Sequence, residues 1–332
     1  MITNVQRMRD ESGLFRPSAT ASTWTLTDGN AGNVRQAEAL AAALGGAFER
    51  WTLQSRAPWR WLAPRILPGA RHAFGDGFAR AWDTPPGLAI GCGRQAALAS
   101  RLLRSRGTRA VQILDPRIDP AHWDLVIAPE HDGLKGRNVI PVLGSLHPID
   151  DLWLAAARRD FASYAALPGP RTALLIGGDS AHTRFDAGTY EVLLDRIASV
   201  VRDESGSVLA TASRRTPADV RARLRQQFSA LPGVVWAGED DGANPYAGLL
   251  AWADRIVCTA DSVNMLSEAA ATLAPVFVAG HERVGGRPRR FIERLLRSRR
   301  VRTVGVDMEP YDVAPLRETA RVAAEVQARL HG

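Results

Sequence analysis

Residues 255–280, RIVCTADSVNMLSEAAATLAPVFVAG, constrain the fold more than any other part of the chain. They predict a strand, a polar turn, a helix and a second strand in direct succession. The run 255–258 is short and apolar, which is typical of a buried parallel strand. An apolar stripe on the helix is expected to pack on the sheet, with Glu268 off that stripe and facing a ligand at the carboxyl edge. The stripe consists of Val263, Leu266, Ala270 and Leu273.

The same turn carries groups suited to a nucleotide diphosphate. Its polar residues are Thr259, Asp261, Ser262 and Asn264. The N-terminus of a helix presents unpaired N–H groups and the positive end of the helix dipole, both of which favour a phosphate. The carboxylate of Glu268 can accept hydrogen bonds from both hydroxyls of a ribose. Many α/β proteins have a capped helix after a strand without any ligand, so a purely structural turn is an open alternative.

Length and composition narrow the class of protein. A chain of 332 residues predicts two α/β domains. It contains no uncharged apolar run of about 18 residues, and residues 1–18 lack the apolar core of a signal peptide. Cys92 and Cys258 show no metal-ligand spacing, so they are expected to be reduced core residues of a cytoplasmic protein.

The net charge of +7 does not by itself predict a nucleic-acid partner. Lys135 is the only lysine among 42 cationic residues, which indicates a genomic bias toward arginine. A basic balance supports non-specific contact with polyanions or anionic lipid. No helix-turn-helix, zinc-finger or RNA-binding motif is present, so nucleic acid is not an expected ligand.

Strand and helix patterns alternate along the chain in two rounds, which predicts parallel sheets with helical crossovers. We expect an N-terminal extension (1–20), a first Rossmann-like domain (21–149), a linker helix (150–170), a second domain (171–311) and a C-terminal helix (312–332). Strands are predicted at 22–27, 47–53, 88–91, 110–114, 125–128, 139–143, 172–176, 207–211 and 234–237. Helices are predicted at 34–44, 94–106, 190–203, 217–229, 246–253, 291–296 and 313–330.

The segment 56–82 departs from this α/β alternation. It mixes three tryptophans with arginines and prolines. Arginine stems and aromatic rings suit a membrane interface, where each side chain keeps one end in water. An ordinary irregular insertion that packs its rings into the first domain is the alternative.

Two polar clusters follow predicted strands of the first domain, at the edge where open α/β sheets bind ligands. The first, DGNAGN, consists of Asp28, Gly29, Asn30, Ala31, Gly32 and Asn33. Its glycines allow a ligand to approach the backbone, and Asp28 is a candidate base. The second is PEHD at 129–132, where His131 is a candidate general base and Asp132 would orient it. A structural turn is the alternative for the second cluster.

Two further clusters follow strands of the second domain. The Gly-rich turn consists of Gly177, Gly178, Asp179 and Ser180, and it suits a phosphate or a sugar. The other consists of Ser213, Arg214, Arg215 and Thr216, whose arginines would neutralise a leaving diphosphate. No D-x-D pattern occurs, so no metal site is predicted. Neither a dinucleotide fingerprint nor a P-loop is present, so no cofactor is expected beyond a nucleotide-sugar donor.

Ordered blocks of the chain resemble the ELM1-like family from about residue 24 to 306. They are TDGNAGNVRQAEAL, CGRQAALASRLLR, PEHDGLKGRNV, IGGDSAHTRF, TASRRTP and WADRIVCTADSVNMLSEAAATLAPVFV. Bacterial members of that family are regarded as glycosyltransferases of the GT-B type, and a plant member is known as a mitochondrial fission factor. The resemblance implies a GT-B-like α/β fold, with two Rossmann-like domains whose parallel sheets face a central cleft.

Residues 255–280 are also similar to the donor site of MurG-type glycosyltransferases. That similarity implies that Glu268 binds the ribose and that Asp261 and Ser262 lie near the sugar or the phosphates, with Asn264 and Ser267 on the same helix. In those enzymes the first Gly-rich loop contacts the acceptor and ends in a histidine considered catalytic. Asn33 stands at that position here, so the base is unassigned between Asp28 and His131. The expected acceptor-binding residues are Gly29, Asn30, Gly32, Asn33 and, in the GSLHP block, His147.

The resemblance implies metal-independent transfer of a sugar from a nucleotide-sugar to a glycan or a lipid-linked acceptor, of the cell-surface polysaccharide or lipopolysaccharide type. Closure of the two domains would align donor and acceptor and exclude water. The expected location is the cytoplasm, with peripheral contact to the inner membrane through 56–82. A GT-B-fold sugar-nucleotide epimerase or hydrolase and a non-enzymatic, membrane-associated recruiting protein are the alternatives.

Overall fold

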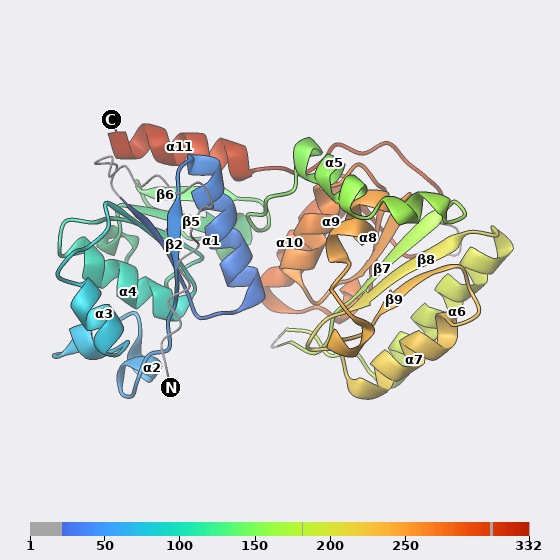
Figure 1. Ribbon diagram of the computed structural model, residues 1–332, viewed down its shortest axis with the longest axis horizontal. Helices are drawn as coiled ribbons and strands as arrows, with labels where there is room; N and C mark the ends of the chain where they lie inside the picture. The colour runs from blue at the N-terminus through green and yellow to red at the C-terminus, as the bar shows by residue number, and fades with distance from the viewer. Residues whose placement is uncertain (1–21, 181, 306–307, 332) are drawn as a thin grey trace, which may run out of the picture. The chain divides into compact units, whose positions relative to one another are not determined.

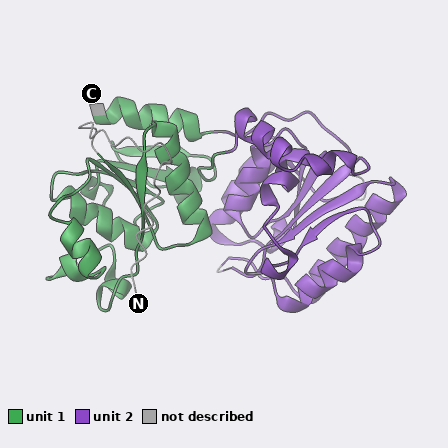
Figure 2. Cartoon of the chain, viewed as in Figure 1, with its two compact units in different colours: residues 1–148, 318–332 green, residues 149–317 purple. Residues whose placement is uncertain are grey.

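The computed structural model describes residues 22–180, 182–305 and 308–331. The chain divides into two compact units, residues 1–148 with 318–332 and residues 149–317 (Figure 2). The predicted N-terminal extension lies outside the described residues.

Unit 1 is built on a six-stranded parallel sheet in the order β2-β1-β3-β4-β5-β6 (Figure 1). Its strands are β1 (Thr23–Thr27), β2 (Phe48–Thr52), β3 (Leu88–Cys92), β4 (Arg109–Ile113), β5 (Leu125–Pro129) and β6 (Val139–Val142). The main crossover helices are α1 (Ala31–Leu44) and α4 (Arg94–Arg104). Alternate residues of the central strands enter different buried clusters: Ala89 packs with Trp24 and Trp51, whereas Ile90 packs with helix α1. The sheet is therefore covered on both faces.

The C-terminal helix α11 (Thr319–His331) belongs to unit 1 and packs on α1. Val322 and Val326 are fully buried with Leu40 of α1. The sequence placed the start of this helix at 313, six residues too early. The chain crosses from unit 2 back to unit 1 before the helix begins.

Unit 2 contains a second six-stranded parallel sheet, in the order β12-β11-β10-β7-β8-β9. Its strands are β7 (Arg171–Ile176), β8 (Ser207–Ala212), β9 (Gly233–Trp236), β10 (Arg255–Thr259), β11 (Val276–Ala279) and β12 (Val301–Thr303). Its helices are α5 (Asp151–Asp160), α6 (Ala187–Asp203), α7 (Ala218–Phe228), α8 (Tyr246–Trp252), α9 (Val263–Ala270) and α10 (Gly286–Arg297). Helices α6 and α7 cover one face, and α8, α9 and α10 lie on the other (Figure 1). The predicted parallel α/β class is confirmed.

The structure corrects the predicted packing of α9. Leu266 and Ala270 are fully buried, as expected, but Leu273 is 57% exposed because the helix ends at Ala270 and Leu273 lies in the following turn. Glu268 was placed off the buried stripe, yet it is 2% exposed. The sequence also missed β12, whose three residues are too few to give a pattern, and began α10 at 291 rather than at Gly286.

The segment 56–82 forms two short helices, α2 (Trp59–Leu62) and α3 (Asp76–Ala81), with a 3₁₀ turn between them. Phe74 and Phe78 are buried against Trp51. The alternative of an insertion packed into the first domain therefore holds for this half of the segment. Among the described residues, no helix is long and apolar enough to cross a membrane.

Candidate functional site

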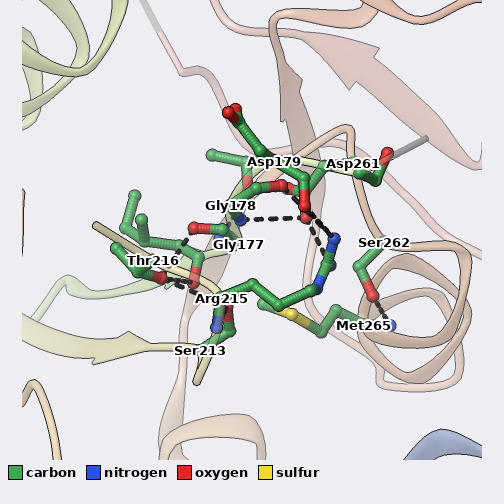
Figure 3. A network of polar contacts seen from close by, with 12 residues as sticks. Gly177, Gly178, Asp179, Ser213, Arg215, Thr216, Asp261, Ser262 and Met265 are labelled. Carbon is green, nitrogen blue, oxygen red and sulfur yellow. Dashed lines mark hydrogen bonds and ion pairs between the residues drawn. The ribbon is translucent and has the colours of Figure 1, made fainter. Parts of the chain in front are cut away.

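A network of polar contacts in unit 2 lies at the carboxyl ends of three neighbouring strands, β8, β7 and β10 (Figure 3). Gly177 and Gly178 follow β7, residues 213–216 follow β8, and Asp261 follows β10. Ligands of open α/β sheets bind at this edge. The sequence assigned these three loops separately, and the sheet order brings them together.

Asp261 joins the three loops. Its carboxylate accepts hydrogen bonds from the Gly178 N–H (3.1 Å), the Thr259 hydroxyl (2.7 Å) and Nη2 of Arg215 (2.6 Å). The side chain of Asp261 is fully buried. Burial raises the pKa of Asp261, and the Thr259 hydrogen bond, the Arg215 charge and the Gly178 N–H oppose that rise. Asp261 therefore fixes the loops in place, and no ligand is needed to account for its contacts.

Arg215 supplies the cation of this cluster. Its Nη1 donates to the carbonyl oxygens of Gly178 (3.3 Å) and Asp179 (3.0 Å), while its side chain remains 43% exposed. The guanidinium is thus held in one position and has a face in solvent. The neighbouring Arg214 is exposed, as is Asp179, and Ser180 is half-buried. An anion at this edge would meet an oriented positive charge.

Neighbouring groups lie so close to Gly177 and Gly178, the two residues after β7, that no side chain fits at either position. A Cβ on Gly177 would lie 2.0 Å from Oδ1 of Asp261, and one on Gly178 would lie 2.1 Å from the backbone oxygen of Arg215. Thr216 ties the loops from the other side, since its hydroxyl donates to the Gly177 carbonyl (2.6 Å). Ser213 contacts the Thr216 hydroxyl at 3.1 Å. The Gly-Gly pair lets three backbone segments pack within hydrogen-bonding distance.

Helix α9 begins beside this cluster. Ser262 caps it by accepting from the Met265 N–H (3.3 Å), and Asn264 is half-buried in the first turn. Ser267 is buried and donates its hydroxyl to the Val263 carbonyl within the helix (2.7 Å). Of these, Ser262 and Asn264 lie nearest the exposed end of the helix.

Glu268 has a specific partner that the sequence reasoning missed. The hydroxyl of Tyr246 donates to Oε2 of Glu268 at 2.6 Å. Tyr246 is the half-buried first residue of α8, and the buried Pro245 separates it from the exposed residues 239–244. Its position after Asn-Pro, at the start of a helix on the carboxyl edge, is the signal that could have identified it.

A pocket of ≈ 200 Å³ lies on the α6 face of the same sheet, at the ends of β10, β11 and β12. Thr259 lines it and also belongs to the polar cluster. Tyr190 lines it as well and is 3% exposed; among the described residues its hydroxyl has no hydrogen-bond partner. Burial, together with the charges of Asp261 and Asp179, raises the pKa of Tyr190, so its hydroxyl remains protonated. The sequence identified Tyr190 only as the start of a helix.

In unit 1, the DGNAGN block forms a local network. Oδ1 of Asp28 accepts from the Asn30 N–H and from Nδ2 of Asn33, both at 3.0 Å. Gly32 and Asn33 were placed in a turn, but they lie in the first turn of α1, which begins at Ala31. Gly29 is exposed, with a φ of +81°. Asp28 is thus held by its own loop after β1.

Cys92 lies behind this network. Its Sγ contacts Oδ1 of Asn33 at 3.6 Å, and the residue is fully buried. Burial and the nearby charge of Asp28 raise the pKa of the Cys92 thiol. The expectation that both cysteines are core residues is confirmed, since Cys258 is buried in the same way.

The remaining predicted residues of unit 1 lie at other strands. His131 and Asp132 are half-buried in a 3₁₀ turn after β5. His147 is 3% exposed after β6, and its backbone N–H and carbonyl both bond to the Thr319 hydroxyl of α11 (3.2 and 2.7 Å). Strands β1 and β5 are separated by β3 and β4, so Asp28 and His131 are about 15 Å apart along the sheet edge. This distance is too long for a hydrogen bond between the two side chains.

Among the described residues, no group of three or more His, Cys, Asp or Glu side chains is placed to hold a metal ion.

The two Rossmann-like units, with polar loops at the carboxyl edge, define the chain as a member of the GT-B fold class. Solved structures of similar fold include UDP-GlcNAc 2-epimerase from Methanocaldococcus jannaschii (TM-score 0.54, 10% identity, covering 94% of this chain and 99% of that one). MnaA of S. aureus, solved with UDP, is similar too (TM-score 0.52, 9% identity, 94% and 97% covered). UDP-GlcNAc 2-epimerase from Neisseria meningitidis, bound to UDP-GlcNAc, gives a TM-score of 0.50 at 10% identity, with 93% and 100% covered. At these identities the likeness concerns the fold.

The family is identified by sequence. The family described as Mitochondrial fission ELM1 matches residues 31–330, and the chain belongs to it. The chain is 33% identical over 277 residues to the mitochondrial fission protein ELM1 of Arabidopsis thaliana, covering 74% of this chain. It spans 64% of the length of that plant protein. It is also 25% identical over 350 residues to the uncharacterized protein RP120 of Rickettsia prowazekii, covering 92% of this chain and 98% of that one.

Proposed function

We propose that this chain is a glycosyltransferase that binds a nucleotide-sugar at the carboxyl edge of the unit 2 sheet. The observation that carries the proposal is the joining of three strand-end loops through the buried Asp261, with the half-exposed guanidinium of Arg215 held among them. The proposed donor-binding residues are Gly177, Gly178, Asp179, Ser180, Ser213, Arg214, Arg215, Thr216, Asp261, Ser262, Asn264, Ser267 and Glu268.

The diphosphate is proposed to bind beside Arg215 and the first turn of α9. Arg215 is oriented by Asp261 and by two carbonyl oxygens, so it loses little freedom when an anion binds. Arg214 adds a second, exposed positive charge. Because arginine and helix N-termini supply the positive charge, the proposed reaction is metal-independent.

The ribose is proposed to bind Glu268. Tyr246 orients the carboxylate by donating to Oε2 (2.6 Å). A carboxylate has about four lone-pair sites, so this hydrogen bond is compatible with others from ribose hydroxyls. Glu268 is only 2% exposed, so a bound ribose must displace a group that covers the carboxylate while the Tyr246 hydrogen bond is kept.

In the proposed reaction, an acceptor hydroxyl attacks the anomeric carbon of the donor sugar. The bond from that carbon to the diphosphate breaks, the nucleoside diphosphate leaves with the electron pair, and a base takes the hydroxyl proton. Asp28 and His131, the latter with Asp132, are the candidate bases. Gly29, Asn30, Gly32, Asn33 and His147 are the proposed acceptor residues. The proposed acceptor is a glycan or a glycolipid, reached from the cytoplasm with peripheral membrane contact through 56–82.

The test is turnover of the nucleotide-sugar that binds, with and without membrane extracts that contain glycan and glycolipid acceptors. Acceptor-dependent release of nucleoside diphosphate supports transfer. Conversion of the sugar-nucleotide without an acceptor would replace transfer by epimerase or hydrolase activity. Failure of every nucleotide-sugar to bind the folded protein would contradict both and favour a recruiting protein.

A further inference from the structure

Large apolar side chains of unit 1 are exposed on and just after helix α2, at the far end of the unit from α11 (Figure 1). Trp61 is 63% exposed, Leu62 40% and Ile66 44%. Single exposed apolar residues are ordinary, but three within six positions form a patch that a soluble monomer would be expected to cover. We call these three residues, together with the arginines Arg56, Arg60, Arg65 and Arg71, the α2 surface.

The α2 surface is strongly basic. No aspartate or glutamate occurs between Glu49 and Asp76, a stretch that contains five arginines. Arg50 pairs with Glu38, whereas the other four are exposed. Within the described part of the chain, none of these four forms an ion pair with a carboxylate. They are Arg56, Arg60, Arg65 and Arg71.

The backbone of the α2 surface is fixed from behind. Nη2 of Arg94 donates to the Arg60 carbonyl (2.9 Å), and Nη1 of Arg101 donates to the Pro64 carbonyl (3.1 Å), both from helix α4. Ala63 is buried in the core below. The exposed side chains therefore project from a supported turn, whose backbone would not need to be ordered on binding.

We propose that the α2 surface binds the surface of an anionic lipid bilayer. Trp61, Leu62 and Ile66 would enter the boundary between headgroups and acyl chains, and the arginines would contact the phosphates. The arginines of the α2 surface are complementary to anionic lipid, because the residues between Glu49 and Asp76 include no aspartate or glutamate. This inference deepens the peripheral contact included in the proposed function, but its test requires neither a nucleotide nor sugar transfer.

The test is co-sedimentation of the full chain with vesicles of phosphatidylcholine alone and of phosphatidylcholine mixed with phosphatidylglycerol. We expect binding to the mixed vesicles that weakens with added salt, because the lipid charge is screened. Replacing Arg60 and Arg65 by glutamine should weaken binding by about fivefold for each arginine. The double variant Trp61→Ser with Leu62→Ser should weaken it by roughly tenfold or more, since the apolar anchor is removed.

Matched controls lie in unit 2. Leu152→Ser removes a more exposed leucine (81%), and Arg159→Gln removes an exposed arginine, both on α5. Both controls should bind like the wild type. No binding to the mixed vesicles, equal binding to neutral ones, or equal losses in α2-surface and control variants that retain the wild-type circular dichroism would overturn the proposal. Vesicle binding can fail while a nucleotide-sugar still binds, so the two proposals fail separately.

Discussion

Replacing Gly177 by alanine tests whether the strand-end loops of unit 2 are held together as described. The added Cβ would lie 2.0 Å from Oδ1 and 2.1 Å from Oδ2 of Asp261, where ordinary contacts are 3.4–4 Å. The carboxylate must therefore move by more than 1 Å. That movement breaks its hydrogen bonds to Gly178, Thr259 and Arg215 and leaves a buried charge without its partners.

The loss in free energy of unfolding follows from those contacts. The hydrogen bonds from the Gly178 N–H and the Thr259 hydroxyl each contribute about 1 kcal/mol to the free energy of unfolding. The ion pair with Arg215 contributes about 1 kcal/mol more, after allowance for the solvent exposure of Arg215. Gly177→Ala should therefore destabilise unit 2 by about 3 kcal/mol, or roughly 6–12 °C in melting temperature for a domain of this size.

Gly188→Ala is the matched control, because it lies in the first turn of α6 and its Cβ would be 3.8 Å from the nearest atom. It should leave stability unchanged or raise it by up to about 1 kcal/mol. Differential scanning calorimetry gives the melting temperatures of both variants and of the wild type. Equal melting temperatures for Gly177→Ala and the wild type would refute the packing of Gly177 on Asp261.

Three further substitutions test single contacts of unit 2. Tyr190→Phe deletes a buried hydroxyl that has no partner among the described residues, so it should raise the free energy of unfolding by about 1 kcal/mol in urea titrations; a loss would mean that this hydroxyl is bonded. Tyr246→Phe deletes the donor to the Glu268 carboxylate and should lower the free energy of unfolding by roughly 1.5–3 kcal/mol. An unchanged free energy of unfolding would show that the 2.6 Å contact is not formed in solution. The pKa of Asp261 is raised above 3.8 in the folded state, so its contribution to stability is largest below that value and is lost as the pH rises through the folded pKa. Asp261→Asn should remove this pH dependence, and wild-type and variant stabilities that run parallel above pH 3.8 would contradict it.

The fold was predictable because buried parallel strands give apolar runs that the sequence shows directly. The run at 172–176 is fully buried in β7, and the Gly-Gly pair after it marks the turn. Helix starts were less accurate, since Gly32 and Asn33 read as turn residues yet lie inside α1. Glycine and asparagine are poor formers of helix interiors, but both lie in the first turn, where the Asn33 side chain is held by Asp28.

The site was predictable only in part. The sequence indicated the loops at 177–180, 213–216 and 259–262, because polar residues directly follow each strand. It could not show that Asp261 joins all three, since this depends on β8, β7 and β10 being neighbours in the sheet. It also could not give the burial of Glu268 or its contact with Tyr246, which come from separate helices.

The central claim is that unit 2 binds a nucleotide-sugar through Glu268 and the loops around Arg215. Ligand-observed NMR against UDP-, GDP-, ADP- and CMP-sugars tests it most directly, with the wild type, Glu268→Ala and the exposed control Glu282→Ala measured side by side. One nucleotide class should bind the wild type and Glu282→Ala alike, and Glu268→Ala should abolish this binding. No binding of any class to the folded wild type, or equal binding by Glu268→Ala, would contradict it.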